Sequence, residues 1–132
     1  MIGLDTNIVV RYLAQDDKTQ SLAATRLINT ELSTDARGYI SLVVLAETVW
    51  VMTSLYDADR STVARTIEGL LSAPQLALQE SESIWLALLE YRESTADFSD
   101  ALLSRLARAA GCGHTLTFDR AAAKHPGFAL LK

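Results

Sequence analysis

Four acidic residues in this sequence occupy positions from which carboxylates could do chemistry. Asp5 ends the apolar run Met1–Leu4, and Asp119 directly follows the stretch HTLTF. Glu47 stands within the apolar segment LVVLAETVWVMTSLY, and Asp100 lies in the segment DFSDALL. Acids without His or Cys neighbours suit hard cations such as Mg²⁺ or Mn²⁺ rather than zinc. A divalent cation shared by these acids is therefore one hypothesis for this sequence.

Each aspartate also has a purely structural explanation. Asp5 is placed to cap a helix that begins at Thr6, and Asp119 is placed to cap the turn after it. Asp97 and Asp100 are three residues apart, the spacing of a pair that caps a helix start. The sequence alone leaves capping and metal binding open for these residues.

Glu47 needs a different explanation because no helix end is near it. The apolar residues of its segment lie nearly all round the predicted helix, which indicates deep burial. Burying an unpaired carboxylate costs on the order of several kcal/mol, so Glu47 requires a partner. The partner is either the shared metal ion or an arginine of another helix, Arg26 or Arg105.

The elements that must position these acids alternate between strand length and helix length. Short apolar runs predict strands at 1–4, 39–41, 75–79, 114–118 and 128–131. Helical periodicity predicts helices at 6–13, 18–32, 42–56, 63–71, 81–94 and 97–111. Ser41 is the expected N-cap of the third helix, and Gly111 is expected to close the last one.

Strands separated by helices indicate an α/β fold. We expect a three-layer α/β/α domain with a mostly parallel central sheet of four to five strands. The carboxyl ends of parallel strands meet at one edge of a sheet, where ligands bind. Asp5 and Asp119 each follow a predicted strand, so both are expected at that edge.

Length and composition predict one globular domain over residues 1–132. Of the 132 residues, 49% are hydrophobic and 21% are charged, with 6 Gly and 2 Pro. These values exclude a disordered or fibrous protein, and the length suffices for one hydrophobic core.

The charge balance gives no general attraction to nucleic acid. The 12 basic and 16 acidic residues leave a net charge of −4, which argues against binding through a broad positive field. A nuclease whose acids hold metal ions is still compatible, because the cations supply local positive charge.

Cysteine usage and the N-terminus favour a cytoplasmic location. Cys112 is the single cysteine, so no internal disulfide is possible. The N-terminus lacks the pattern of a signal peptide, and no apolar window is long enough to span a bilayer. We expect a soluble cytoplasmic protein without a membrane partner.

Four segments together resemble one family. LDTNIVVRYL at the start, Glu47 in an apolar helix, ADFSDALL and LTFD occur in that order. In this the chain is similar to the PIN-domain ribonucleases, specifically the VapC-type toxins of bacterial toxin–antitoxin pairs, and the similarity runs nearly end to end. Each motif is weak alone, and the four acids in order make the signal specific.

The resemblance implies roles for individual residues. The catalytic set that holds Mg²⁺ or Mn²⁺ would be Asp5, Glu47, Asp100 and Asp119. The supporting residues would be Thr6 and Asn7 after the first acid, Thr117 at the rim of the pocket, and Asp97 as a helix cap or outer acid. Asn7 would orient a carboxylate or a metal-bound water. Arg11, one helical turn after Asn7, is either a phosphate contact or a solvated surface residue.

The resemblance also implies an activity and partners. The chain would be a metal-dependent endoribonuclease that cleaves RNA with a metal-activated water. It would act as the toxin of a type II toxin–antitoxin pair, form a homodimer and bind a VapB-like antitoxin. Two alternatives stay open: a phosphoryl-handling domain of the receiver or aspartyl-phosphate hydrolase type, and a binding module without catalysis.

Overall fold

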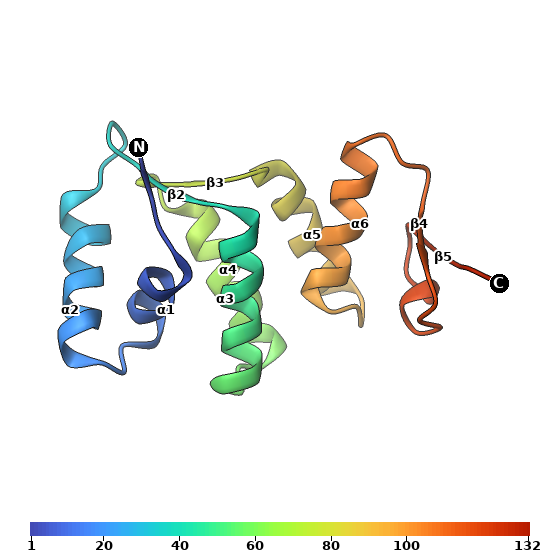
Figure 1. The fold of residues 1–132 in the computed structure, drawn as a ribbon, viewed down its shortest axis with the longest axis horizontal. Coiled ribbons are helices and arrows are strands. Elements are labelled where there is room, and N and C mark those ends of the chain that lie inside the picture. Colours follow the sequence, from blue (N-terminus) through green and yellow to red (C-terminus); the bar gives the residue numbers. More distant parts are fainter. The chain divides into compact units, whose positions relative to one another are not determined.

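A computed structural model describes residues 1–132 (Figure 1). The chain falls into two compact units. Unit 1 comprises Met1–Gln79 and unit 2 comprises Glu80–Lys132. No helix in either unit is long and apolar enough to cross a membrane.

Unit 1 contains a three-stranded parallel sheet in the order β1-β2-β3. Its strands are β1 (Ile2–Gly3), β2 (Gly38–Ile40) and β3 (Leu76–Leu78). Gly3 pairs with Tyr39, which in turn pairs with Ala77. Because the strands are parallel, the residues that follow them lie along the same edge of this sheet.

Unit 1 also contains four α-helices, which are labelled in Figure 1. They are α1 (Thr6–Ala14), α2 (Lys18–Arg26), α3 (Leu42–Leu55) and α4 (Arg60–Ser72). The side chains of Asp5, Asp17, Ser41 and Asp59 cap their N-termini. The caps predicted at Asp5 and Ser41 are thereby confirmed.

The segment after α2 departs from the regular helix predicted over 18–32. The α-helix ends at Arg26, and Leu27–Glu31 forms a π-helical turn. The side chains of Leu32 and Leu4 leave little room at Gly38 in β2. A Cβ at this position would lie 2.7 Å from Leu32 and 2.9 Å from Leu4. β2 therefore packs directly against the leucine that ends this turn.

The burial predicted for α3 is wrong within unit 1. Only Leu45, Thr48 and Val49 are buried, whereas Val43 and Trp50 are 68% and 61% exposed. A helix with apolar residues on every side can still bury only the side that a neighbour covers. In unit 1 that side packs against α1 and α4.

Unit 2 begins with two packed helices, α5 (Ser81–Glu93) and α6 (Phe98–Ala109). Tyr91 and Phe98 meet edge to face, with their ring centroids 5.9 Å apart. Gly111, just beyond α6, has φ of +97°, the left-handed conformation in which glycine commonly ends a helix. The predicted closure of this helix by Gly111 is confirmed.

The rest of unit 2 forms a two-stranded parallel sheet. The strands are β4 (Thr115–Thr117) and β5 (Phe128–Leu130), with a short 3₁₀ turn (Ala122–Lys124) between them. Each predicted strand region contains a strand, and every strand pair is parallel. The predicted α/β class with parallel strands is confirmed.

Candidate functional site

Asp5 lies two residues after β1 and caps α1. Its Oδ1 accepts a hydrogen bond from the backbone N–H of Ile8 at 3.2 Å, and its side chain is exposed. The capping explanation for Asp5 is therefore confirmed. Capping uses one carboxylate oxygen, which leaves Oδ2 available to a cation.

Glu47 is joined to the residue next to Asp5. Thr6 Oγ1 donates a hydrogen bond to Glu47 Oε1 at 3.3 Å, which links α1 to the middle of α3. The carboxylate of Glu47 is exposed within unit 1, so the expectation that it is buried and must be neutralised is wrong there. Thr6, rather than Asn7, is the residue that hydrogen-bonds a carboxylate.

Within unit 1, the arginine predicted as a structural partner of Glu47 is not seen in that role. Arg26 belongs to unit 1 and forms no ion pair with Glu47 there. In unit 2, Arg105 Nη2 lies 3.6 Å from Glu90 Oε1, and both side chains are mostly buried. Arg105 thus has a carboxylate partner on α5.

Asp5 and Asn7 open onto a cavity of about 690 Å³ beside α1 and α2. α1 contributes Arg11 to the same lining, and α2 contributes Gln20 and Arg26. Asn7 is exposed to solvent. The polar residues that follow β1 therefore face a space large enough for part of a ligand.

Arg11 is fixed in the wall of this cavity rather than extended into solvent. Its Nε donates to Gln20 Oε1 at 2.8 Å, and its Nη1 donates to Asp16 Oδ1 at 3.1 Å. Its side chain is 33% exposed. Arg11 is thus an ordered, partly exposed surface residue, and its role as a phosphate contact stays a prediction.

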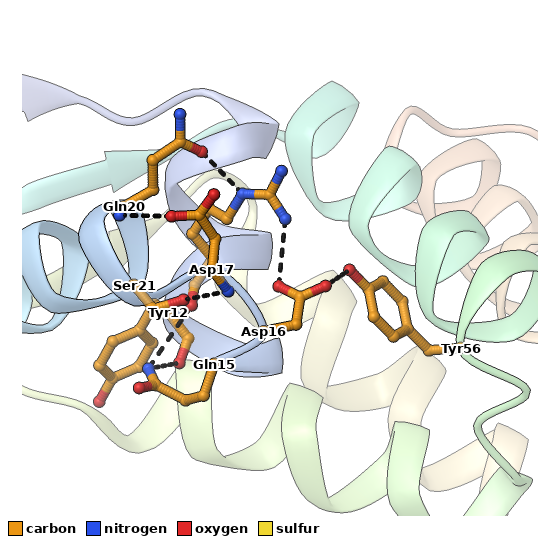
Figure 2. Close-up of polar contacts among 8 residues, drawn as sticks. Tyr12, Gln15, Asp16, Asp17, Gln20, Ser21 and Tyr56 are labelled. Carbon is orange, nitrogen blue, oxygen red and sulfur yellow. Dashed lines mark hydrogen bonds and ion pairs between the residues drawn. The ribbon is translucent and has the colours of Figure 1, made fainter.

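Asp16 is held from its other side by Tyr56, as Figure 2 shows. Tyr56 Oη donates a 2.5 Å hydrogen bond to Asp16 Oδ2. This bond, together with Arg11, lowers the pKa of the Asp16 carboxyl, and the same bond raises the pKa of Tyr56. Asp16 is thus a charged anchor between Arg11 and the end of α3.

The turn between α1 and α2 is closed by its own polar contacts, drawn in Figure 2. Gln15, with φ of +57°, ends α1 and donates from Nε2 to Tyr12 O at 2.7 Å. Asp17 Oδ1 accepts the backbone N–H of Gln20 at 2.8 Å and so caps α2. The start of α2, and with it Gln20, is held firmly relative to α1.

Asp97 and Asp100 in unit 2 form the predicted capping pair. Asp97 Oδ1 accepts the backbone N–H of Asp100 at 2.8 Å and caps α6. Asp100 therefore lies in the first turn of α6, where the N-terminus of a helix favours negative charge. The prediction that Asp97 is a helix cap is confirmed.

Asp119 is held in the loop after β4. Its Oδ1 accepts the backbone N–H groups of Ala121 at 2.8 Å and Ala122 at 3.3 Å. Its own N–H donates to Thr117 Oγ1 at 3.0 Å. Thr117, predicted at the rim of the site, thus fixes the backbone of Asp119, whose turn-capping role is also confirmed.

Asp100 lies close to the charges of two other acids in unit 2. The pKa of the Asp100 carboxyl is raised by partial burial and by the charges of Asp97 and Asp119, and His125 acts in the opposite direction. A divalent cation would offset this repulsion, and carboxylate oxygens are the donors that Mg²⁺ and Mn²⁺ prefer. Within neither unit do three His, Cys, Asp or Glu side chains gather closely enough to hold a metal ion by themselves.

The predicted site residues thus form two groups, one in each unit. Unit 1 holds Asp5, Thr6, Asn7, Arg11 and Glu47, and unit 2 holds Asp97, Asp100, Thr117 and Asp119. Each group contains carboxylates fixed by hydrogen bonds to helix starts, turns or a hydroxyl. Chemically, each group offers hard oxygen ligands for a divalent cation.

The chain is an α/β protein, and in each unit a carboxylate follows the end of a parallel strand. The family model described as PIN domain matches residues 2–127, and the chain belongs to the PIN domain family. Proteins of this family are generally metal-dependent nucleases that use Mg²⁺ or Mn²⁺. No curated protein matches the chain.

The match confirms the family part of the resemblance noted in the sequence. It also confirms the fold class, a three-layer α/β/α PIN-like domain. The match continues through both units, and the single domain over residues 1–132 stays a prediction. The receiver, hydrolase and binding-module alternatives gain no support from it.

Sequence analysis missed the second set of residues around the unit 1 cavity. Gln20 and Arg26 line it, and Asp16 and Tyr56 hold Arg11 in place. Gln20 and Arg26 are six positions apart, a spacing that does not place two residues on one helix face, so periodicity gave no signal for the first pair. No local pattern joins Asp16 to Tyr56, because the two residues are 40 positions apart.

Proposed function

We propose that this chain is a Mg²⁺- or Mn²⁺-dependent endoribonuclease. The observation that carries the proposal is the PIN domain match over residues 2–127, within which all four acids predicted to be catalytic lie. Their order and local context, described above, support the assignment to RNA-cleaving members of the family. RNA phosphodiester bonds are the proposed substrate.

The proposed metal ligands are Asp5, Glu47, Asp100 and Asp119. When bound, the cation lowers the pKa of a coordinated water and stabilises negative charge on the phosphate under attack. The protein supplies carboxylates at fixed positions and needs no nucleophilic side chain. Thr6 orients Glu47 through its hydroxyl, and Thr117 holds the backbone of Asp119.

Asp97 contributes to this function indirectly. It fixes the first turn of α6 and adds negative charge next to Asp100. Asn7 faces the same cavity as Asp5 and is proposed to orient a carboxylate or a metal-bound water.

Cleavage of cellular RNA tests the proposal directly. Purified protein is incubated with RNA in Mg²⁺ or Mn²⁺, with EDTA, and as the Asp5→Asn and Asp119→Asn variants. Asp35→Asn is the matched control, because Asp35 is an exposed acid that precedes β2, at the opposite end of the parallel strands from Asp5. Discrete fragments that disappear with EDTA and with both ligand variants, but persist in the control, are expected. Wild-type activity in both ligand variants would refute the assignment.

Metal binding gives a second readout that does not depend on activity. Mn²⁺ titration by calorimetry is carried out on wild type, on Asp5→Asn and Glu47→Gln, both in unit 1, and on the double variant. If the acids share one ion, each single substitution weakens the same binding event, and the double variant loses little more than the worse single one. Independent, additive losses would contradict a shared ion.

We further propose that the chain is the toxin of a type II toxin–antitoxin pair acting in the cytoplasm, with a VapB-like antitoxin and a homodimeric state. The motif resemblance in the sequence supports this step. Induced expression in a bacterial host is expected to stop growth with wild type and not with Asp5→Asn. Equal growth of both strains, with both proteins present at equal levels, would refute the toxin role.

A further inference from the structure

We propose that the cavity between α1 and α2, the α1–α2 cavity, binds a backbone phosphate of the RNA substrate through Arg11 and Arg26. This proposal rests on the proposed ribonuclease function and adds to it the place where the RNA strand continues from the scissile bond. Asp5, a proposed metal ligand, lines the same cavity as both arginines. A strand whose reacting phosphate is at Asp5 would therefore have a neighbouring phosphate within this cavity.

The helical repeat explains why these residues share the cavity. On α1, Asn7 and Arg11 are one turn apart and lie on the same side of the helix. On α2, Gln20, Ala23 and Ala24 follow the same spacing. The two alanines have small side chains, which leaves a space of about 690 Å³ between the longer polar residues.

Arg11 is already oriented before any ligand arrives. Gln20 and Asp16 engage Nε and Nη1, so only Nη2 lacks a hydrogen-bond partner in the protein. A flexible arginine loses side-chain entropy when it binds a phosphate, and a preorganised one has lost it on folding. Tyr56 completes the arrangement by holding Asp16 from α3's end.

Arg26 supplies a second guanidinium group to this cavity, and its donors are free for a ligand. It is exposed, lines the α1–α2 cavity, and forms no hydrogen bond or ion pair through its side chain. Guanidinium groups recognise phosphate through paired N–H donors. An unpaired arginine beside a preorganised one fits a phosphate diester better than an apolar ligand.

The charge balance of the lining indicates a local contact rather than a broad attraction. Asp5 and Glu31 oppose the two arginines, so the cavity has no large net positive charge. The affinity for RNA should therefore come from one or two placed contacts. For single strands, each phosphate contact changes the slope of log K against log salt by about 0.7.

The test measures binding of a fluorescein-labelled single-stranded RNA by anisotropy over a range of salt concentrations in Mg²⁺. The Asp119→Asn protein is the background, because it is expected not to cleave and the substitution lies in unit 2, outside this cavity. Arg11→Ala and Arg26→Ala are each expected to weaken binding about tenfold, the size of one charge-assisted hydrogen bond, and to reduce the salt slope by about 0.7.

Arg37→Ala is the matched control. Arg37 is exposed and precedes β2, at the opposite edge of the sheet from Asp5. The Arg37→Ala substitution removes the same charge from unit 1 but leaves the α1–α2 cavity unchanged. The RNA affinity and the salt slope should therefore stay close to those of the background protein. If Arg37→Ala lost as much RNA affinity as Arg11→Ala and Arg26→Ala do, net charge alone would be responsible, and the proposal would be overturned.

Gln20→Ala separates positioning from charge. It removes the Nε anchor of Arg11 but keeps every charge, so affinity should fall about threefold, less than for loss of the whole contact, with an unchanged salt slope. In the cleaving protein, Gln20→Ala should raise KM more than it lowers kcat. A purely structural role would instead lower the melting temperature and leave KM unchanged, and would overturn the role of Gln20.

The outcomes distinguish this inference from the proposed function. RNA cleavage by wild type, together with unchanged RNA binding in Arg11→Ala and Arg26→Ala, overturns the cavity and leaves the ribonuclease standing. Arginine-dependent RNA binding without cleavage in any cation supports the cavity and refutes the ribonuclease. Binding of an acidic peptide but not of RNA overturns the cavity as an RNA site. If Arg11→Ala fails to fold, Arg11→Lys replaces it and should still weaken binding, since lysine cannot keep both anchors.

Discussion

Thr6 of α1 and Glu47 of α3 are joined by a hydrogen bond of 3.3 Å, although 41 positions separate them in the chain. This bond places the residue beside Asp5 against the only acid in α3. It fixes the Glu47 carboxylate against the residue that follows Asp5, through a hydroxyl that is not itself a proposed metal ligand. The same bond gives a way to disturb one carboxylate without removing it.

Thr6→Val is expected to lower RNA cleavage about tenfold or more, the range found when a residue that orients a metal ligand is lost. Valine keeps the shape of threonine but cannot donate to Glu47. Thr6→Ser keeps the hydroxyl and is expected to retain most activity. Cleavage rates and Mn²⁺ affinity are compared, and equal values for the valine and serine variants would contradict the role of this bond.

The Asp97 cap allows charge and helix stability to be separated. Asp97→Ala removes the hydrogen bond to the Asp100 N–H and should lower the free energy of unfolding by about 1 kcal/mol. Asp97→Asn keeps the cap and removes only the charge, so stability should stay near that of wild type. The pKa of Asp100, raised in part by Asp97, should fall in both variants.

Carboxyl NMR titration without metal measures that pKa, and urea unfolding measures the stability. The asparagine variant is the informative one, because its fold is expected to be intact. A pKa of Asp100 that does not move in Asp97→Asn would show that burial and the charge of Asp119 raise it without Asp97.

Local signals in the sequence were enough to predict where the acids lie. Asp5 and Ser41 were predicted as helix caps because a short polar side chain stands just before an apolar helical pattern, and the structure confirms both. Gly111 was predictable for a similar reason, since a glycine after a helical repeat commonly takes positive φ. These features depend on residues within a few positions of one another.

Features that depend on distant packing could not be predicted in this way. The exposure of Val43 and Trp50 is decided by which neighbours cover α3, and the apolar pattern of the helix does not specify them. The π-helical turn Leu27–Glu31 occurs where the chain packs against Gly38. The cavity that contains Arg11 exists because α1 and α2 pack side by side, which periodicity alone does not reveal.

Asp16 should contribute to stability in a pH-dependent way. Its pKa is lowered in the folded protein, chiefly by the Tyr56 hydrogen bond, so the folded state holds the charged form more strongly than the unfolded state does. That contribution is fully present above the unfolded pKa of about 3.9 and is lost as the pH falls through the lower folded pKa.

Melting temperature as a function of pH tests this for wild type, Asp16→Asn and Tyr56→Phe. The melting temperature of wild type should exceed that of Asp16→Asn by a constant amount near neutral pH, and this difference should shrink in acid. Tyr56→Phe removes the largest cause of the lowered pKa and should reduce the pH dependence. A difference between wild type and Asp16→Asn that stays constant into strong acid would contradict the link.

Gly127 is expected to be intolerant of any side chain. Its φ is +88°, and a Cβ there would collide with Ser104 Oγ, which donates a hydrogen bond to Pro126 O at 3.3 Å. Gly127 O accepts the N–H of Thr115 at 2.7 Å where β4 and β5 begin to pair. Gly127→Ala should therefore cost about 1–3 kcal/mol, the range for a strained backbone residue.

Gly113→Ala is the control for this change in the same unit. Gly113 has no positive φ, and a Cβ at that position would meet nothing within 4 Å, so the free energy of unfolding should change by less than about 0.5 kcal/mol. Urea unfolding of both variants measures the difference. Because β4 leads to Thr117 and Asp119, Gly127→Ala should also reduce cleavage, whereas Gly113→Ala should not. Equal stability of the two variants would show that the loop before β5 can shift away from Ser104 at little cost.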